Sequence, residues 1–146
     1  KSEGTELEAV TITSLCEHKA QRKKVPGLGH PQHTGEDPRA TRLIKIADEL
    51  QLSGQHIKTL HILGQHAGKI LDRPLPINVS GAIPACLLDA GWPLDALKAI
   101  PLIARAAGLS AHLFEETQRS IGFIMSHNAD LAIEYDGKRS AKNESE

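Results

Sequence analysis

Apolar residues recur every three or four positions along most of the chain, which is the spacing of a helix with one buried face. The clearest pattern covers residues 37–52, and a second follows from 53 or 54 to 71, with Ser53-Gly54 between them. Such a link is typical of a helix end and favours antiparallel neighbours. The apolar face of the second pattern consists of Ile57, Leu60, Leu63, Ala67 and Ile70.

Weaker helical patterns precede and follow these two. Residues 1–5 look like a polar end, and the expected helices cover residues 6 to about 23, 81–90, 94–107, 109–117 and 121–133. Ser80 is suited to cap the helix that begins at 81. Pro101 predicts a kink, because proline lacks the helical N–H donor. Almost no segment alternates as a strand does, so the sequence predicts an all-α fold.

The amino-acid composition indicates a globular domain and excludes several classes of binding protein. The chain has 146 residues, 40% of them apolar, which is enough for a domain with a buried core. Its 17 basic and 18 acidic residues nearly cancel, which argues against nucleic-acid or membrane-surface binding. No apolar run approaches a membrane span, and the amino terminus is not signal-like. Cys16 and Cys86 lie far apart, so we expect free thiols in a reducing cytoplasm.

One segment, Val25-Pro26-Gly27-Leu28-Gly29-His30, is a candidate site. Its two glycines allow tight turns and a close approach of the backbone to a ligand. Further along, Asp37 can cap a helix, Pro38 fits the first turn, and Arg39 offers donors suited to a carboxylate or phosphate. A plain turn followed by an ordinary helix start would use the same residues, so the residue pattern leaves both interpretations open.

The histidines give little support for a metal site. His56, His61 and His66 recur at intervals of five on one predicted helix. Five residues rotate a helix by about 140° beyond a full turn, so these side chains cannot converge on one ion. His30 and His33 could share a metal in their loop, but no cysteine or carboxylate pair accompanies them. We therefore expect surface histidines and no metal.

The candidate segment, with Asp37-Pro38-Arg39, resembles the motif of the citrate synthase family, and two later motifs follow in the family's order. Residues 78–81 (Asn-Val-Ser-Gly) resemble its Asn-Val-Asp segment, and residues 104–112 resemble its Arg-x-x-Gly-x-x-Ala-His helix. Residues 76–82 and Glu115-Glu116 look more like the citryl-CoA lyase branch than the synthases proper.

The resemblance implies a citrate synthase-like helical fold, of which this chain is the carboxy-terminal part. Residues 1–92 would form a small-domain-like helical segment with the loop for CoA and the acid. Residues 93–134 would form helices like those at the end of the large domain, and residues 135–146 a polar tail. The expected partners are a second copy of the chain, or a chain that supplies the missing N-terminal part.

Proteins of this family join acetyl-CoA to oxaloacetate, or cleave citryl-CoA, through an enol of the CoA thioester. By position, His30 matches the histidine that donates to the keto or alcohol oxygen. Arg39 and Arg105 match two carboxylate-binding arginines, and Arg119 resembles a further arginine that is donated across a dimer interface. The residues that match the loop around the adenine of CoA are Pro26, Gly27, Leu28 and Gly29.

Two departures from the family pattern leave three functional hypotheses. Ser80 stands where the family has its aspartate base, and an unaided hydroxyl does not remove a carbon-bound proton near neutral pH. The upstream His-Gly-Gly motif with the other catalytic histidine is absent from this chain. The favoured hypothesis is that this chain forms part of a citryl-CoA lyase or citrate synthase-like enzyme. Such an enzyme is a lyase or transferase, and Ser80 would occupy its catalytic position. The alternatives are a weakened relative that binds CoA or a carboxylic acid without turnover, and a dimerisation module.

Overall fold

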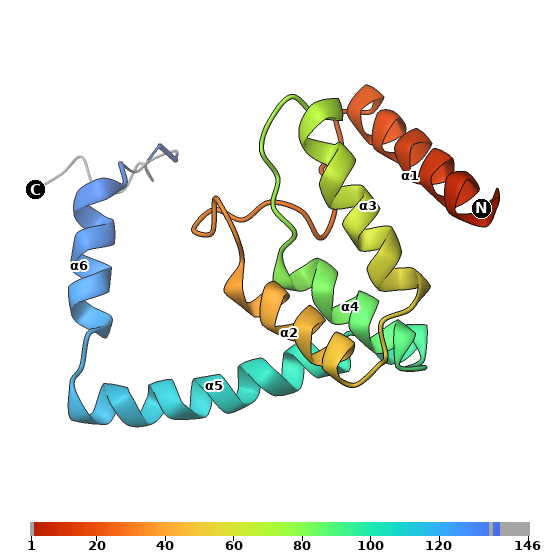
Figure 1. Cartoon of the computed structure of the whole chain (residues 1–146). Coiled ribbons are helices and arrows are strands. Elements are labelled where there is room, and N and C mark those ends of the chain that lie inside the picture. The colour runs from red at the N-terminus through yellow and green to blue at the C-terminus, as the bar shows by residue number, and fades with distance from the viewer. Residues whose placement is uncertain (1, 135, 138–146) are drawn as a thin grey trace, which may run out of the picture. The chain divides into compact units, whose positions relative to one another are not determined.

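The computed structural model describes residues 2–134 and 136–137, with side chains from residue 4 onward. Within this part no strand forms, and Leu28 and Ile77 make an isolated antiparallel bridge. The predicted all-α fold is therefore confirmed. The helices in Figure 1 are α1 (Ser2–Ala20), α2 (Pro38–Glu49), α3 (Gln55–Ile70), α4 (Val79–Asp89), the 3-10 helix η1 (Leu94–Ala96), α5 (Ala99–Gln118) and α6 (Gly122–Ala132).

The chain divides into two compact units, residues 1–98 and residues 99–146. The first contains α1 to α4 and η1, and the second contains α5 and α6. The sequence predicts a boundary between residues 92 and 93. That boundary separates the two domains of the citrate synthase fold rather than compact units of this chain, and it stays a prediction. Apart from residues 136–137, the predicted polar tail lies outside the described residues.

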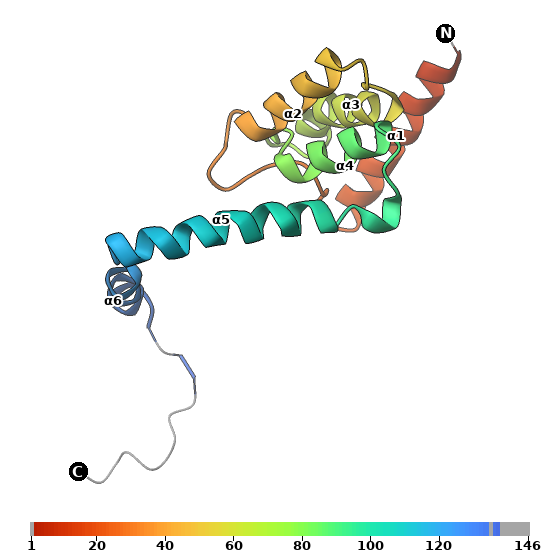
Figure 2. The same cartoon turned by 90° about the horizontal axis from the view of Figure 1, so that it is seen from below.

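In the first unit, α4 packs against both α2 and α3, and α1 packs against α3 (Figure 1 and, from below, Figure 2). Alanines line the contact of α4 with α2, which lets the two backbones come close. One core cluster consists of Ala40, Ala47, Ile57, Leu60, Ala82 and Ala85, and a second of Leu15, Leu28 and Ala67. The second cluster joins α1, α3 and the stretch before α2 through apolar burial, the main favourable contribution to folding.

The start of α3 is anchored by Asp89, the last residue of α4. Its Oδ2 accepts the backbone N–H groups of Gly54 and Ile57 at 2.8 and 2.9 Å. Its Oδ1 accepts the backbone N–H and the Nδ1 of His56 at 2.9 and 2.8 Å. The backbone N–H groups among them are ones that a helix leaves without partners at its first turn. A single carboxylate, 3% exposed, thus connects the end of α4 to the beginning of α3.

Helices α1 to α4 all end in the same way. A residue with left-handed backbone follows each helix, and the next N–H donates to a carbonyl five positions earlier, which is a common way to satisfy the last carbonyls of a helix. The left-handed residues are Arg22, Gln51, Asp72 and Gly91, with φ of 52°, 56°, 55° and 81°. The predicted ends near 23 and 52 were wrong by about one turn for this reason, and residues 2–5, predicted as a polar end, are helical.

The cap of α4 differs from the prediction. Asn78, rather than Ser80, is the N-cap, and its Oδ1 accepts the backbone N–H groups of Ser80 and Gly81 at 2.9 and 3.2 Å. Both residue types suit this position. Asn78 occupies it because its own backbone N–H is held by the Gly27 carbonyl, which places the chain before the helix. Ser80 therefore lies inside the first turn.

In the second unit, α5 is one continuous helix where two were predicted, and Pro101 causes no break. It is the third residue of α5, where a proline does not cost a helical hydrogen bond. The Glu116 carboxylate links α5 to α6, because it accepts the Ser120 hydroxyl at 2.7 Å and the Gly122 N–H at 3.0 Å.

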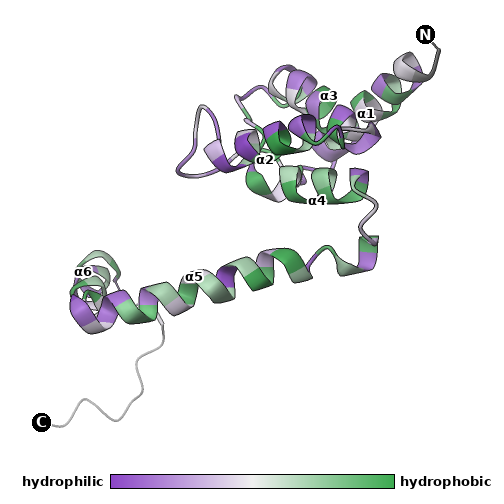
Figure 3. Cartoon of the chain, turned by 60° about the horizontal axis from the view of Figure 1, so that its bottom comes forward, coloured by the Kyte–Doolittle hydropathy of each residue, from purple (hydrophilic) through white to green (hydrophobic). Residues whose placement is uncertain are grey.

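None of the described residues of α5 and α6 is buried. Figure 3 shows hydrophobic residues along much of α5. The exposed apolar side chains of this unit include Leu102, Ile103, Leu109, Leu113, Phe114, Phe123, Ile124, Met125 and Leu131.

Among the described residues, one stretch, Leu94–Gln118, is long and apolar enough to cross a membrane, by length and composition only. The expectation that no apolar run approaches a membrane span was therefore wrong by this criterion. Length and composition alone are weak support for a span. Arg105 lies within this stretch, and a charged side chain inside a bilayer is costly.

Candidate functional site

The glycine loop, residues 25–30, is fastened to the segment that precedes α4. The Gly29 N–H donates to the Pro76 carbonyl at 2.7 Å, and the Asn78 N–H donates to the Gly27 carbonyl at 3.0 Å. The Asn78 amide donates to the Gly29 carbonyl at 2.5 Å. Gly27 and Gly29 have φ of +82° and +74°, a region that side chains other than glycine rarely adopt. The two glycines are therefore required by the backbone itself.

Asp37 is buried at the start of α2, with none of its surface exposed. Its carboxylate pairs with Arg39 through Nε and Nη2, both at 2.9 Å, and it also accepts the Arg39 backbone N–H at 3.1 Å. The Val79 N–H, at the start of α4, donates to Oδ2 at 2.8 Å. The Arg39 side chain, helped by the Val79 and Arg39 N–H groups, holds the pKa of Asp37 well below its usual range although burial opposes this.

His30 lies next to this pair. Its Nδ1 accepts the backbone N–H groups of Gln32 and His33 at 3.1 and 3.2 Å. A neutral imidazole has one proton, so we assign that proton to Nε2. The Nη2 of Arg39 lies 3.3 Å from this Nε2. With the proton on Nε2, both groups are donors, so an oxygen atom placed beside them could accept from both.

The predicted site residues of the glycine loop, together with Ser80, line two separate hollows. His30, Leu28 and Gly29 line a hollow of about 430 Å³ together with Lys24 and Arg73. Pro26, Gly27 and Ser80 line a separate hollow of about 270 Å³. The structure therefore brings His30 and Arg39 together, and it places Ser80 in a neighbouring hollow.

Arg105 and Arg119 belong to the second unit, where Arg105 lies on α5 and Arg119 directly after it. Both are exposed. Arg119 lines a hollow of about 640 Å³ between α5 and α6, together with Glu116 and Met125. The convergence of these two arginines with His30 and Arg39 stays a prediction.

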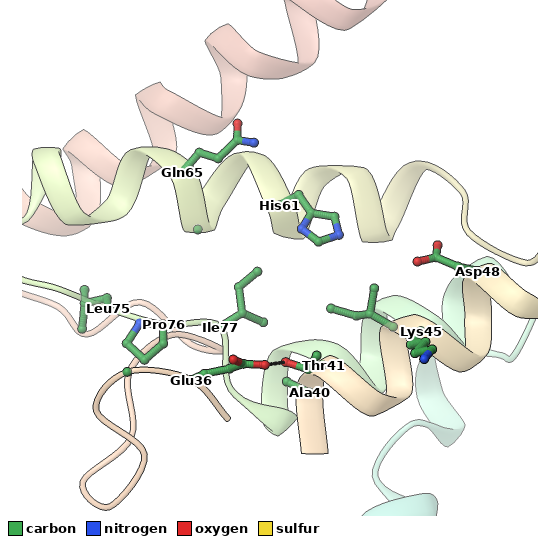
Figure 4. Close-up of a pocket in the computed structure, with 13 residues that line it drawn as sticks. Glu36, Ala40, Thr41, Lys45, Asp48, His61, Gln65, Leu75, Pro76 and Ile77 are labelled. Atoms are coloured by element: carbon green, nitrogen blue, oxygen red, sulfur yellow. Dashed lines mark hydrogen bonds between the residues drawn. The ribbon is translucent and has the colours of Figure 1, made fainter. Parts of the chain in front are cut away.

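A cleft of about 510 Å³ between α2 and α3 was not predicted from the sequence. In Figure 4, His61 extends from α3 into the space between the two helices, and Ile77 lies below it. Neither His30 nor Ser80 lines this cleft.

The other histidines of α3 pair with carboxylates. His56 contacts Asp89 and His66 contacts Glu8, both at 2.8 Å. In the part of the chain that the structure describes, no three or more His, Cys, Asp or Glu side chains form a group that could hold a metal ion. Both cysteines there are free, with Cys16 exposed and Cys86 half-buried, as the sequence predicted.

We expect the free energy of unfolding to fall in acid because of Asp37 and Asp89. Burial would raise the pKa of Asp89, but the N–H groups of Ile57, His56 and Gly54 and the His56 side chain lower it below its ordinary value. Both carboxylates thus have a lower pKa folded than unfolded. Their contribution to stability is complete above the ordinary value of 3.8 and is lost as the pH falls below it.

Urea unfolding between pH 7 and pH 2.5 measures this dependence. In Asp89→Asn the decline below about pH 4 should be shallower than in the wild type, because one of the two groups no longer titrates. An identical decline in both proteins would contradict the assignment of acid sensitivity to Asp89.

Comparisons with known proteins identify the family of this chain. The sequence model described as citrate synthase, C-terminal domain, matches residues 4–124. Among solved structures, the chain is similar to citryl-CoA lyase from Hydrogenobacter thermophilus, with 28% identity and a TM-score of 0.68 over 94% of this chain and 56% of that chain. The chain therefore spans a little over half the length of that lyase. A comparison with curated proteins finds no match. The domain match covers most of the chain, and the protein belongs to the citrate synthase family.

Proposed function

We propose that this chain carries the acid-binding and thioester-binding part of a citryl-CoA lyase or citrate synthase-like enzyme. Such an enzyme cleaves citryl-CoA, or joins acetyl-CoA to oxaloacetate, by breaking or forming a carbon–carbon bond through a thioester enol. The observation that carries the proposal is the meeting of two donors, the Nε2–H of His30 and the Nη2 of Arg39, 3.3 Å apart. A keto or alcohol oxygen between them would accept hydrogen bonds from both.

The free edge of Arg39 would hold a carboxylate of the acid. Asp37 engages Nε and Nη2 of the guanidinium, so Nη1 remains available on a side chain that is half exposed. Arginine binds carboxylates through such paired N–H donors. Arg105 and Arg119 are proposed as further carboxylate ligands, on the strength of their positions in the family's motif.

The glycine loop is the proposed contact for the CoA part. Its left-handed glycines leave the backbone without side chains that would obstruct a flat ring, and Lys24 and Arg73 bring positive charge to the hollow beside it. CoA is anionic, so this charge would favour its binding. The thioester is a co-substrate in this proposal, and no metal is required.

A binding protein without turnover is the second candidate. Ser80 has the position of the family's aspartate base, and it is exposed in the first turn of α4. A hydroxyl there needs a neighbouring base to remove a carbon-bound proton. If none is supplied, the chain would hold a dicarboxylic acid or a CoA thioester without reaction.

The proposed assembly is a homodimer, or a complex with a chain that carries the rest of the fold. The many exposed apolar residues of α5 and α6 support this, because exposed apolar patches often mark contacts with other proteins. A cytoplasmic location is proposed on the basis of the two free thiols.

Arg39→Ala should weaken the binding of oxaloacetate by about 10- to 100-fold, because it removes a charge-assisted pair with a carboxylate. Isothermal titration calorimetry measures the affinity, and a coupled assay of citryl-CoA cleavage measures turnover. The matched control is Arg42→Ala, which removes an exposed arginine of α2 that pairs with Glu49 at 3.5 Å. Binding without turnover, even when the chain that carries the rest of the fold is added, favours the second candidate, and absence of binding in the wild type contradicts both.

A further inference from the structure

The carboxylate of Asp37 is more than the cap of α2. Among the described residues it is the one charged residue whose surface is fully buried, and with Leu15 it is one of the two largest fully buried side chains. A cap needs only one neutral acceptor, which serine or asparagine supplies. A buried charge is costly unless it is paired and hydrogen-bonded. The capping of α2 therefore does not explain why the buried residue at position 37 carries a negative charge.

The hydrogen bonds divide between its two oxygens in a way that points to that reason. Oδ1 accepts the Arg39 backbone N–H and Nε, and Oδ2 accepts Nη2 and the Val79 N–H. Pairing through Nε and Nη2 fixes the plane of the guanidinium. The same Nη2 faces Nε2 of His30, so the orientation of the arginine decides where the two donors meet.

Oδ2 of Asp37 also connects the arginine to the start of α4. The Val79 N–H lies at the start of that helix, and Ser80 is the next residue. Asn78, just before it, holds the glycine loop through the Gly29 carbonyl. One carboxylate thus joins the parts of the site that come from α2 and α4.

We propose that Asp37 is a positioning residue, which acts on the ligand through Arg39 by fixing its guanidinium beside His30. The inference rests on the proposed function for its ligand, a dicarboxylic acid. Asp37 itself does not touch the acid, because both of its oxygens are occupied by groups of the chain and its surface is buried.

A double-mutant cycle on the full chain tests this proposal. Asp37→Asn should weaken the binding of oxaloacetate by about tenfold in the presence of Arg39, and by less than about twofold in the Arg39→Ala background, because residues that act through each other are not additive. Asp37→Ser keeps an acceptor for the cap, and it replaces the asparagine variant if that variant does not fold. Equal losses in both backgrounds, or tighter binding in Asp37→Asn, would overturn the proposal.

A second measurement does not depend on the ligand. In the wild type, the Arg39 Nε–H should give a slowly exchanging resonance in ¹H–¹⁵N NMR spectra, assigned by its loss in Arg39→Lys, and Asp37→Asn or Asp37→Ser should abolish it. Glu36→Gln is the control, because Glu36 bonds to Thr41 and should leave the signal intact. If the wild type binds no dicarboxylic acid but this pattern appears, the proposed function fails, while the fixing of the Arg39 guanidinium by Asp37 stands. An unchanged signal in both Asp37 variants overturns the role.

Discussion

Gly27→Ala is expected to lower the free energy of unfolding by roughly 2–5 kcal/mol, the sum of a left-handed backbone penalty and an overpacked contact. Gly27 has φ of +82°, and a Cβ there would lie 2.8 Å from the Cα of Gly81. Backbone atoms of α4 cannot rotate away from the added carbon, so the glycine loop would have to leave its place. Urea unfolding followed by circular dichroism measures the loss.

The matched control is Gly35→Ala, a few residues further along the same connection. No atom lies within 4 Å of a Cβ at Gly35. We expect a change within about 0.5 kcal/mol, as for most exposed positions. Similar losses in the two variants would show that the close contact of Gly27 with Gly81 is not what requires glycine.

Asp89→Ala is expected to lower the free energy of unfolding by roughly 2–4 kcal/mol, because the first turn of α3 loses its acceptor. The N–H groups of Gly54, His56 and Ile57 would be left without a partner, at a place where the carboxylate is only 3% exposed. Faster hydrogen exchange of these amides, relative to those at the end of α3, would locate the effect.

Asp95→Ala provides the comparison for charge alone. Asp95 is an exposed acid shortly after α4, and its removal changes the net charge by the same amount. We expect a change within about 0.5 kcal/mol. Asp89→Asn should fall between the two, since one acceptor oxygen remains. A loss in Asp89→Ala no larger than that in Asp95→Ala would refute the anchoring of α3 by this carboxylate.

The helices α2 and α3 were predictable because local and tertiary preferences agree there. Asp37 caps α2, Gly54 precedes α3, and the predicted apolar face of α3 faces the core through Ile57, Leu60 and Ala67. The glycine loop was identified from two glycines whose left-handed backbone the structure bears out. The motif order then indicated the family correctly.

The helix ends were less predictable, because three of the left-handed residues are not glycine. Arg22 and Gln51 adopt this conformation although their residue types do not favour it, and Asp72, of a type that only occasionally adopts it, does so as well. The choice between Asn78 and Ser80 as cap depends on a hydrogen bond to the distant Gly27 carbonyl, which no local pattern contains. The burial of Asp37 depends in the same way on Val79, far along the chain.

The exposed apolar surface of the second unit bears on the stability of its helices. A helix in water gains little from its own hydrogen bonds, and most helices in proteins owe their stability to the burial of an apolar face. In α5 and α6, among the described residues, that face is turned to solvent. If the partner proposed above covers that face, the stability of this unit depends on the protein concentration, and dilution should unfold it well before the first unit, whose core lies within its own helices.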